Sequence, residues 1–146
     1  MKITEVTKKD FADWVELGAL FWHRHPIKKS EKEFKRILAS KNETSFLCRD
    51  DDGGPVGFVY VAIRTDYVEG SKTSPVGYLE GIYIKKEYRK KGVAKRLFQE
   101  TKKWFKNNKV SEIGSDAELE NIISQKFHKS VGFKKGETLI HFIRKI

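Results

Sequence analysis

Cysteine is nearly absent from this chain of 146 residues, and Cys48 is the only one. A single thiol can build neither an internal disulfide framework nor a thiolate-rich metal site. Cys48 lies in the apolar run Ser45–Cys48, where a buried structural thiol is far more common than a nucleophile. The four histidines show no metal-ligand spacing within one element. We therefore expect no disulfide and no metal.

Long apolar runs are also missing. No stretch approaches the roughly 20 apolar residues of a membrane span, and Met1–Glu5 lacks the continuous apolar segment of a signal peptide. The length and the 38% hydrophobic content suit one core and are too small for two ordinary domains. We find no internal repeat or low-complexity segment. The expectation is a single domain, residues 1–146, in the cytoplasm and without membrane contact.

Acidic residues are outnumbered by basic ones, twenty against thirty, which leaves a net charge of +10. Such an excess suits an anionic partner: a nucleic acid, an acidic membrane surface or a phosphorylated cofactor. Lysines that lie on the surface and contact only solvent would give the same excess of positive charge. Charge alone therefore does not choose among these partners.

What the chain does contain is an alternation of β-like and helix-like segments. Strands are expected at 2–6, 44–49, 56–63, 77–84, 111–115 and 139–143, and helices around 11–21, from Ser30, at 93–105 and at 119–131. Thr7 with Asp10 resembles a capping signal for the first helix, and Ser30 with Glu33 resembles one for the second. Asp51–Pro55 is typical of a hairpin turn. The order predicts a mixed α/β sheet.

The turn Arg89–Ala94 is the most informative segment, because it joins an apolar strand to an amphipathic helix. Helix starts leave backbone N–H groups unpaired and carry a partial positive charge, so a glycine turn there can close on a phosphate. Arg and Lys in the same turn add charge-assisted hydrogen bonds. Gly81, which interrupts the preceding strand, suggests a bulge. The turn predicts a phosphate-binding loop, although a basic surface turn would look the same.

With this order of elements, Arg89–Ala94 resembles the R/Q-x-x-G-x-G/A turn of the GCN5-related N-acetyltransferase superfamily. Asn121 and Gly132-Phe133 match the second signature of that superfamily. A closer resemblance, to the aminoglycoside 6'-N-acetyltransferases, is carried by Trp22, His25-Pro26, Asp66–Gly70, Ser74-Pro75, Leu79–Ile82, Ser115–Asn121, Ile123–Gln125, His128 and Gly132-Phe133. The resemblance implies an acyl-CoA N-acyltransferase fold, a central, mostly antiparallel sheet flanked by helices.

The resemblance also implies acetyl-CoA as the co-substrate. Its pantetheine arm would run along the central strand and contact Ile82, Tyr83 and Ile84 mainly through the main chain. The residues expected to hold the pyrophosphate are Arg89, Lys90, Lys91, Gly92, Val93 and Ala94, with Lys95 as the next candidate. Asn121 is expected to orient the pantetheine.

For the acceptor, the resemblance implies a primary amine that must lose a proton before it attacks the thioester. Glu80 and Asp116 are the carboxylates expected to attract the amine and take the proton. The alternatives are a helix N-cap for Asp116 and a solvent-facing strand position for Glu80. His128 stands where many members have a tyrosine, as the acid for the leaving thiolate or only as a cofactor contact. Trp22, His25 and Tyr67 match the far wall of the acceptor pocket, with core packing as the alternative for Trp22.

The net charge of +10 is a poor long-range attractor for a cationic acceptor, so local charge has to overcome it. We expect an acidic acceptor pocket, separate from the basic cofactor side, formed by Asp66, Glu69, Glu80, Asp116, Glu118 and Glu120.

The sequence therefore predicts an acetyl-CoA-dependent N-acetyltransferase that acts on the 6'-amine of aminoglycosides by direct attack in a ternary complex. A homodimer is expected from the resemblance alone. One alternative is the same chemistry on a polyamine, an amino acid or a protein amine. An alternative of another class is a basic nucleic-acid-binding module that uses the lysines and arginines of 85–96. No nucleic-acid motif accompanies them, so we expect no nucleic-acid partner.

Overall fold

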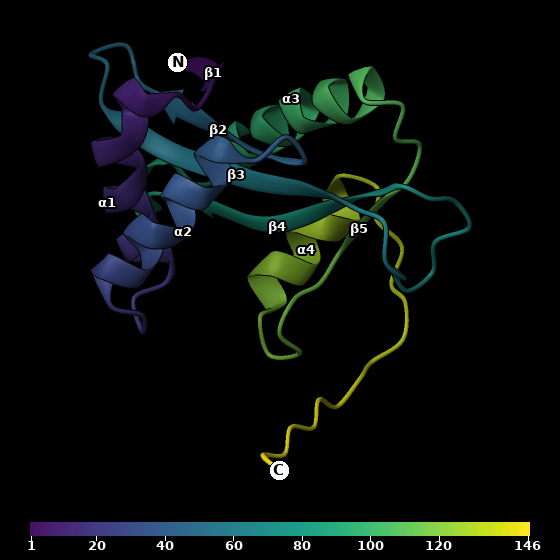
Figure 1. The fold of residues 1–146 in the computed structure, drawn as a ribbon. Helices are drawn as coiled ribbons and strands as arrows, with labels where there is room; N and C mark the ends of the chain where they lie inside the picture. Colours follow the sequence, from purple (N-terminus) through teal and green to yellow (C-terminus); the bar gives the residue numbers. More distant parts are fainter.

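A five-stranded sheet with the order β1-β2-β3-β4-β5 organises the computed structural model, which describes all residues 1–146 (Figure 1). Its strands are β1 (Lys2–Glu5), β2 (Glu43–Arg49), β3 (Pro55–Arg64), β4 (Val76–Ile84) and β5 (Ile113–Ser115). The pairs from β1 to β4 are antiparallel, whereas β5 runs parallel to β4. The predicted mixed, mostly antiparallel sheet is confirmed.

Helices cover both faces of the sheet. They are η1 (Lys8–Asp10), α1 (Phe11–Phe21), α2 (Ile27–Ala39), η2 (Lys86–Tyr88), α3 (Val93–Asn107) and α4 (Ile122–Ser130). Phe46 and Cys48 of β2 pack in the cluster that holds the apolar face of α3, whereas Leu47 between them packs with α1 and α2. Since neighbouring strand residues point to opposite faces, α1 and α2 lie on one face and α3 on the other.

Local sequence signals explain most element boundaries. The capping box of Thr7 and Asp10 forms, and it leads through η1 into α1. The β2–β3 turn closes with a hydrogen bond from the Gly54 N–H to Asp50 Oδ1. The predicted helix start at Ser30 is wrong, because α2 begins at Ile27, directly after Pro26. Proline fixes φ near the helical value and needs no N–H partner, so it starts the helix one turn early and Ser30 becomes a buried interior residue.

Strand β4 carries a bulge at Glu80. Tyr60 of β3 is opposite Gly81 and Val61 is opposite Leu79, which leaves Glu80 without a cross-strand partner. The ring of Phe21 would lie 2.9 Å from a Cβ atom at residue 81, so glycine is needed there for close packing. On its other side β4 pairs with β5 only from Gly77 to Leu79. Beyond that point this edge of β4 is open, and we call the place where β4 and β5 part the fork.

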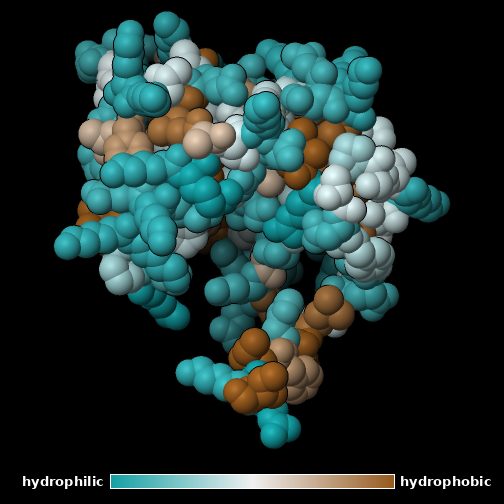
Figure 2. All heavy atoms as spheres, in the orientation of Figure 1, coloured by the Kyte–Doolittle hydropathy of each residue, from teal (hydrophilic) through white to brown (hydrophobic).

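The strand predicted at 139–143 does not form. Residues 134–146 are exposed, and none of them takes part in a hydrogen bond or ion pair. Figure 1 shows this segment leaving the body of the molecule, and Figure 2 shows its apolar side chains standing in solvent. A strand requires a partner edge, and no strand of the same chain lies beside it. None of the helices has the length and hydropathy that a membrane crossing requires.

Candidate active site

The turn before α3 has the backbone geometry of an anion-binding loop. Lys90 and Gly92 adopt left-handed conformations with φ values of 60° and 76°. From Lys90 to Lys95 no backbone N–H donates to an acceptor in the protein. Successive unpaired N–H groups at the start of a long helix form a concave site for phosphate oxygens. Lys90, Lys91 and Lys95 are exposed and form no ion pair, so their charge is available there.

The side chain of Arg89 contacts the end of β4 and stabilises this loop. Its Nε donates to the main-chain oxygen of Ile84 at 2.9 Å, and its guanidinium carbon lies 5.8 Å from the centroid of the Tyr83 ring. These contacts tie the start of the loop to the end of β4. Of the residues predicted at the pyrophosphate, Arg89 is therefore placed to hold the loop in shape, with its outer guanidinium nitrogens still exposed.

The open edge of β4 beyond the fork can pair with an extended arm of a ligand. The main-chain N–H of Lys85 donates to the main-chain oxygen of Val56 on β3. Main-chain groups alternate in direction along a strand, so the main-chain groups of Ile84 and Ile82 point toward the open edge. Tyr83 does not fit the predicted main-chain contact, because its carbonyl oxygen faces Gly57 on β3. The loop and this edge together fit a molecule with a pyrophosphate and an amide-bearing arm, as coenzyme A has.

Four polar side chains form a chain of contacts beside the fork. Arg64, at the end of β3, donates to Glu80 Oε1 from Nε at 3.0 Å and from Nη2 at 2.7 Å. Its guanidinium also lies over the ring of Tyr78, 3.5 Å from the centroid. The Tyr78 hydroxyl donates to Asp116 Oδ2 at 2.7 Å. The two predicted acceptor carboxylates therefore belong to one network that crosses β3, β4 and the end of β5.

The two carboxylates of this network have different surroundings. Burial raises the pKa of Glu80, and Arg64 offsets part of that rise. Asp116 is exposed. Burial is the largest cause of the raised pKa of Tyr78, and the hydrogen bond to Asp116 is the second, so the Tyr78 hydroxyl keeps its proton and donates it to that bond. Asp116 does not cap α4, because the side chain of Asn121 does so by accepting from the Ser124 N–H at 3.0 Å. Because the Asp116 carboxylate does not cap the helix, it can bind a cation.

His128 of α4 reaches the fork through Ser115. Its Nε2 lies 2.7 Å from Ser115 Oγ, and its Nδ1 lies 2.7 Å from the main-chain oxygen of Ser124. A carbonyl only accepts, so Nδ1 carries a proton. In the neutral ring Nε2 then accepts from Ser115, whereas in the protonated ring it donates, and the Ser115 hydroxyl turns to the Leu79 oxygen at 3.0 Å. The geometry thus serves both protonation states.

The residues predicted for the far wall are more dispersed. Trp22 follows α1 and packs against Phe21, which lies on Gly81 of the bulge. It therefore serves as core packing near β4, and its indole is only partly covered. His25 is exposed in the loop before α2 and makes no side-chain contact with the network. Tyr67 is 78% exposed and donates to Glu69 Oε2 at 2.7 Å.

Of the residues expected to form the acidic pocket, Glu80 and Asp116 contact the Arg64–Tyr78 pair, and the charge of Asp66 contributes to the raised pKa of Arg64. Glu69 and Asp116 line the same cavity, described below. Glu118 and Glu120 are exposed in the segment before α4, and their side chains make no contact with the network. The structure therefore brings together part of the expected acidic set.

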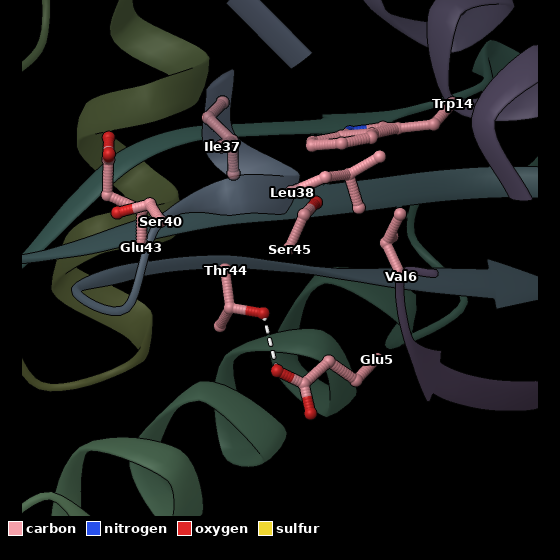
Figure 3. A pocket seen from close by; sticks show the side chains of 9 residues that line it. All are labelled: Glu5, Val6, Trp14, Ile37, Leu38, Ser40, Glu43, Thr44 and Ser45. Carbon is pink, nitrogen blue, oxygen red and sulfur yellow. Dashed lines mark hydrogen bonds between the residues drawn. The ribbon is translucent and has the colours of Figure 1, made fainter. Parts of the chain in front are cut away.

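Two cavities differ in position and size. The larger, of about 650 Å³, is bordered by Val68–Gly70, Tyr78, Ser115-Asp116, His128 and Phe133–Leu139. The smaller, of about 110 Å³, lies between α2 and β2, is lined by Trp14, Ser40 and Ser45 among others, and contains none of the predicted site residues (Figure 3). Only the larger cavity adjoins the fork. The structure brings together no group of three or more His, Cys, Asp or Glu suited to a metal ion.

The profile of the Acetyltransferase (GNAT) family matches residues 14–133 of this sequence. The chain belongs to the GNAT family. The loop before α3, the bulged β4 and the fork all lie within the matched residues. The motifs predicted Glu80, Asp116 and His128 as site residues but missed Arg64, Tyr78 and Ser115, because only the tertiary structure brings these side chains into contact with the predicted ones.

Relatives within the GNAT family share nearly the whole chain. An aminoglycoside N(6')-acetyltransferase type 1 of Serratia marcescens is 39% identical over 88% of each chain. A crystal structure of the apo aminoglycoside 6'-N-acetyltransferase of Acinetobacter haemolyticus superposes with a TM-score of 0.95 at 35% identity, covering 100% of this chain and 99% of the other. The structure of AAC(6')-Iy with the bisubstrate analogue CoA-S-monomethyl-acetylneamine also superposes at 0.95, with 34% identity and 99% and 98% coverage.

Proposed function

We propose that this GNAT protein transfers the acetyl group of acetyl-CoA to the 6'-amine of aminoglycosides. The observation that carries the proposal is the fork, where the partly buried Glu80 is linked through Arg64 and Tyr78 to Asp116 at an open cavity, and where β4 leads into the anion-binding loop. The loop suits the cofactor phosphates, and the cavity beside Asp116 suits a cationic acceptor. The similarity over the full chain to a solved complex with a CoA–neamine analogue supports the same pair of substrates.

The reaction that we infer is direct attack in a ternary complex. Glu80, directly or through a water molecule, takes a proton from the acceptor ammonium while Asp116 holds the rest of the polycation. The amine nitrogen then forms a bond to the thioester carbonyl carbon, and the Ile82 N–H at the open edge is placed to stabilise the oxyanion. The C–S bond breaks, and the thiolate receives a proton from the protonated ring of His128. The nitrogen then loses its second proton to the neutral ring, directly or through a water molecule, which leaves the amide and restores the protonated His128. The products are the N-acetylated acceptor and CoA.

Separation of charge supports a cationic acceptor despite the net charge of +10. Three unpaired lysines, Lys90, Lys91 and Lys95, lie at the cofactor loop, where bound phosphates would neutralise them. Glu80 and Asp116 contact Arg64 and Tyr78 at the fork, and the charge of Asp66 acts on Arg64 as well. A local negative potential can attract a cation at close range even when the overall field opposes it. The same separation of charge explains the basic cluster of 85–96 as a cofactor-binding surface, so a nucleic-acid partner is not needed to explain it.

We further propose that residues 1–146 act as one domain, in the cytoplasm, and as a homodimer. The cytoplasm contains acetyl-CoA, and Cys48 is buried without a disulfide partner. Both facts support that location. The second candidate function is acetylation of another amine, such as spermidine or a lysine side chain. The fork would serve it equally, because its carboxylates recognise positive charge rather than a sugar ring.

The deciding experiment measures CoA release by the purified protein with acetyl-CoA and four acceptors: a kanamycin with a 6'-amine, an analogue with a 6'-hydroxyl, spermidine and a lysine peptide. We expect release with the 6'-amine alone, and mass spectrometry of the product should place the acetyl group there. Preference for spermidine or the peptide would replace the acceptor and keep the chemistry. Absence of both release and acetyl-CoA binding would refute the acetyltransferase assignment at this fork.

A further inference from the structure

The Glu80 carboxylate is held through only one of its two oxygens. Arg64 donates to Oε1 from Nε at 3.0 Å and from Nη2 at 2.7 Å. No hydrogen bond or ion pair in the protein reaches Oε2. Trp14 Nε1 is the only fully buried side-chain polar atom that lacks a partner, so Oε2, which also lacks one, is in contact with solvent. One oxygen of the carboxylate is therefore occupied, and the other is free.

Arg64 is held in turn by an aromatic ring. Its guanidinium carbon lies 3.5 Å from the centroid of the Tyr78 ring. Tyr78 is opposite Ala62, two residues before Arg64, so both side chains lie on the same face of the sheet. The Tyr78 hydroxyl donates to Asp116 Oδ2 at 2.7 Å. A planar guanidinium against a ring has one favoured orientation. The Tyr78 ring therefore orients Arg64, and Arg64 orients Glu80.

Arg64 is also the only positive charge in contact with Glu80. Burial is the largest cause of the raised pKa of Glu80, and the carboxylates of Asp116 and Glu43 raise it further, whereas both influences that lower it come from Arg64. Burial raises the pKa of the two neighbouring phenols, so they stay neutral. The titratable and charged groups around this carboxylate are Glu43 of β2 with its partner Arg36 of α2, Tyr60 and Arg64 of β3, Tyr78 of β4, and Asp116 after β5.

We propose that Arg64 is the positioning residue of the catalytic base, because it occupies Oε1 of Glu80 and leaves Oε2 directed to the acceptor. This inference rests on the proposed function. The proton that leaves the acceptor ammonium goes to Oε2, while Arg64 remains protonated and keeps both hydrogen bonds to Oε1. A carboxylate fixed through one oxygen meets the amine in a single orientation, which the reaction requires. Tyr78 supports this arrangement by holding the guanidinium.

The charge and the geometry of Arg64 have separable effects. Its charge keeps Glu80 ionised at a lower pH than burial alone would allow, because an adjacent cation favours the carboxylate. Its two N–H groups on Oε1 and its planar contact with Tyr78 fix the orientation. Lysine supplies the charge as a flexible point charge and cannot reproduce the planar contact. Methionine has an unbranched side chain too, but supplies neither the charge nor the hydrogen bonds.

The first test is the pH dependence of kcat for Arg64→Met and Arg64→Lys, measured with the acceptor that gives CoA release. Glu80 acts only when deprotonated, so loss of the adjacent positive charge should move the acid limb of the profile to higher pH in Arg64→Met. Arg64→Lys should keep the acid limb near its native position and lower the plateau kcat about tenfold or more, with KM for acetyl-CoA unchanged. An unmoved acid limb in Arg64→Met, or full kcat in Arg64→Lys, overturns the proposal.

The matched control is Arg49→Met. Arg49 is also a partly buried arginine that binds carboxylates, those of Asp10 and Asp13, but it lies at the opposite end of β2 from Glu43. Its loss should change neither the acid limb nor the plateau. An equal movement of the acid limb in Arg49→Met would assign the effect to overall charge and overturn the role of the contact with Glu80. Circular dichroism and acetyl-CoA binding report whether each variant is folded.

A second test needs neither turnover nor an aminoglycoside. Titration followed by NMR of protein labelled with ¹³C-glutamate gives the pKa of Glu80, assigned through Glu80→Gln. This pKa should rise in Arg64→Met and change little in Arg64→Lys. In the native protein the Arg64 Nε–H resonance should shift as Glu80 titrates, a measurement that does not depend on the folding of an Arg64 variant. A Glu80 pKa insensitive to Arg64→Met, or an Arg64 resonance insensitive to Glu80, overturns the proposal. Failure of the proposed reaction remains distinguishable, because these titrations report only on the Arg64–Glu80 pair.

Discussion

At the scale of single residues, burial distinguishes the two carboxylates of the fork. Glu80 is held by Arg64 and has a raised pKa, whereas Asp116 is exposed and held by one hydrogen bond from Tyr78. A base with a raised pKa binds a proton more strongly, which suits proton abstraction from an amine. We therefore assign the proton transfer to Glu80 and the attraction of the acceptor to Asp116.

The assignment predicts different kinetics for two variants. Glu80→Gln should lower kcat by about 10²- to 10⁴-fold. In the native enzyme, activity should fall as the pH drops through the pKa of Glu80, which lies above its usual 4.5 because of burial, since the protonated form accepts no proton. Asp116→Asn should raise KM for the aminoglycoside and leave acetyl-CoA binding unchanged. Steady-state kinetics across pH check both, and an unchanged kcat in Glu80→Gln would remove the assigned base.

Gly92 offers a second test at this scale. Gly92→Val should raise KM for acetyl-CoA about tenfold or more, because a β-branched residue resists a φ of 76° and the loop would lose its shape. Gly53→Val is the matched control: residue 53 has a φ of 86° and, like residue 92, no atom within 4 Å of an added Cβ. Both variants should lose similar stability. Equal effects on KM would mean that strain, and not the loop, is responsible.

His128 is the third case. His128→Gln keeps a hydrogen-bonding group near Ser115 but cannot deliver a proton at neutral pH. We expect kcat to fall about 10²-fold or more if the ring protonates the thiolate, with KM for acetyl-CoA little changed. A rise in KM with kcat preserved would instead make His128 a cofactor contact. Initial rates at varied acetyl-CoA separate the two outcomes.

At the scale of elements, the packing of α3 on β4 holds the anion-binding loop beside the fork. A Cβ atom at Gly77 would lie 2.7 Å from the Phe105 ring of α3. Gly77→Ala should therefore destabilise the protein by about 1–3 kcal/mol, as expected for overpacking. Gly136→Ala, whose Cβ would meet only Glu69 at 3.9 Å, is the control. Urea unfolding measures both, and equal midpoints would show that α3 can shift without cost.

Sequence reasoning succeeded for elements that carry strong local signals. The α3 face from Val93 to Phe105 and the 51–54 turn follow from periodicity and turn chemistry, and both were predicted. Residues 139–143 were predicted as a strand because they favour one, and that prediction was wrong. Composition expresses a preference for extended structure, whereas a strand also requires a neighbouring edge.

At the scale of the whole molecule, an ion pair ties the end of α2 to the edge of the β2–β3 ribbon. Arg36 Nη2 lies 2.7 Å from Glu43 Oε1, and the Tyr60 hydroxyl donates to the same carboxylate. The hydrogen bond from Arg36 lowers the pKa of Glu43 to about 2. The lowered pKa means that this stabilisation is complete above about pH 4.5 and is lost as the pH falls toward 2.

Glu43→Gln should therefore reduce stability near pH 7 by about 1–2 kcal/mol, a value discounted because Arg36 is half exposed. The loss should shrink as the pH falls below 4.5. Glu33→Gln removes the other, more exposed partner of Arg36 and should change stability by less than about 0.5 kcal/mol. Urea unfolding at pH 7 and pH 3 measures these differences. Equal losses for the two variants would contradict the role given to burial at Glu43.

The amino-acid sequence by itself determined the order of elements from β1 to α4, the basic glycine turn before α3 and the membership of the chain in the GNAT family, because these depend on neighbours along the chain. Tertiary structure alone decided which groups meet. Arg64 is opposite Val76 on β4, and its side chain passes over the ring of Tyr78 to reach Glu80. The shortness of β5 opens the fork. Residues 139–143 show the same limit, since they favour a strand while pairing depends on an edge that local sequence does not contain.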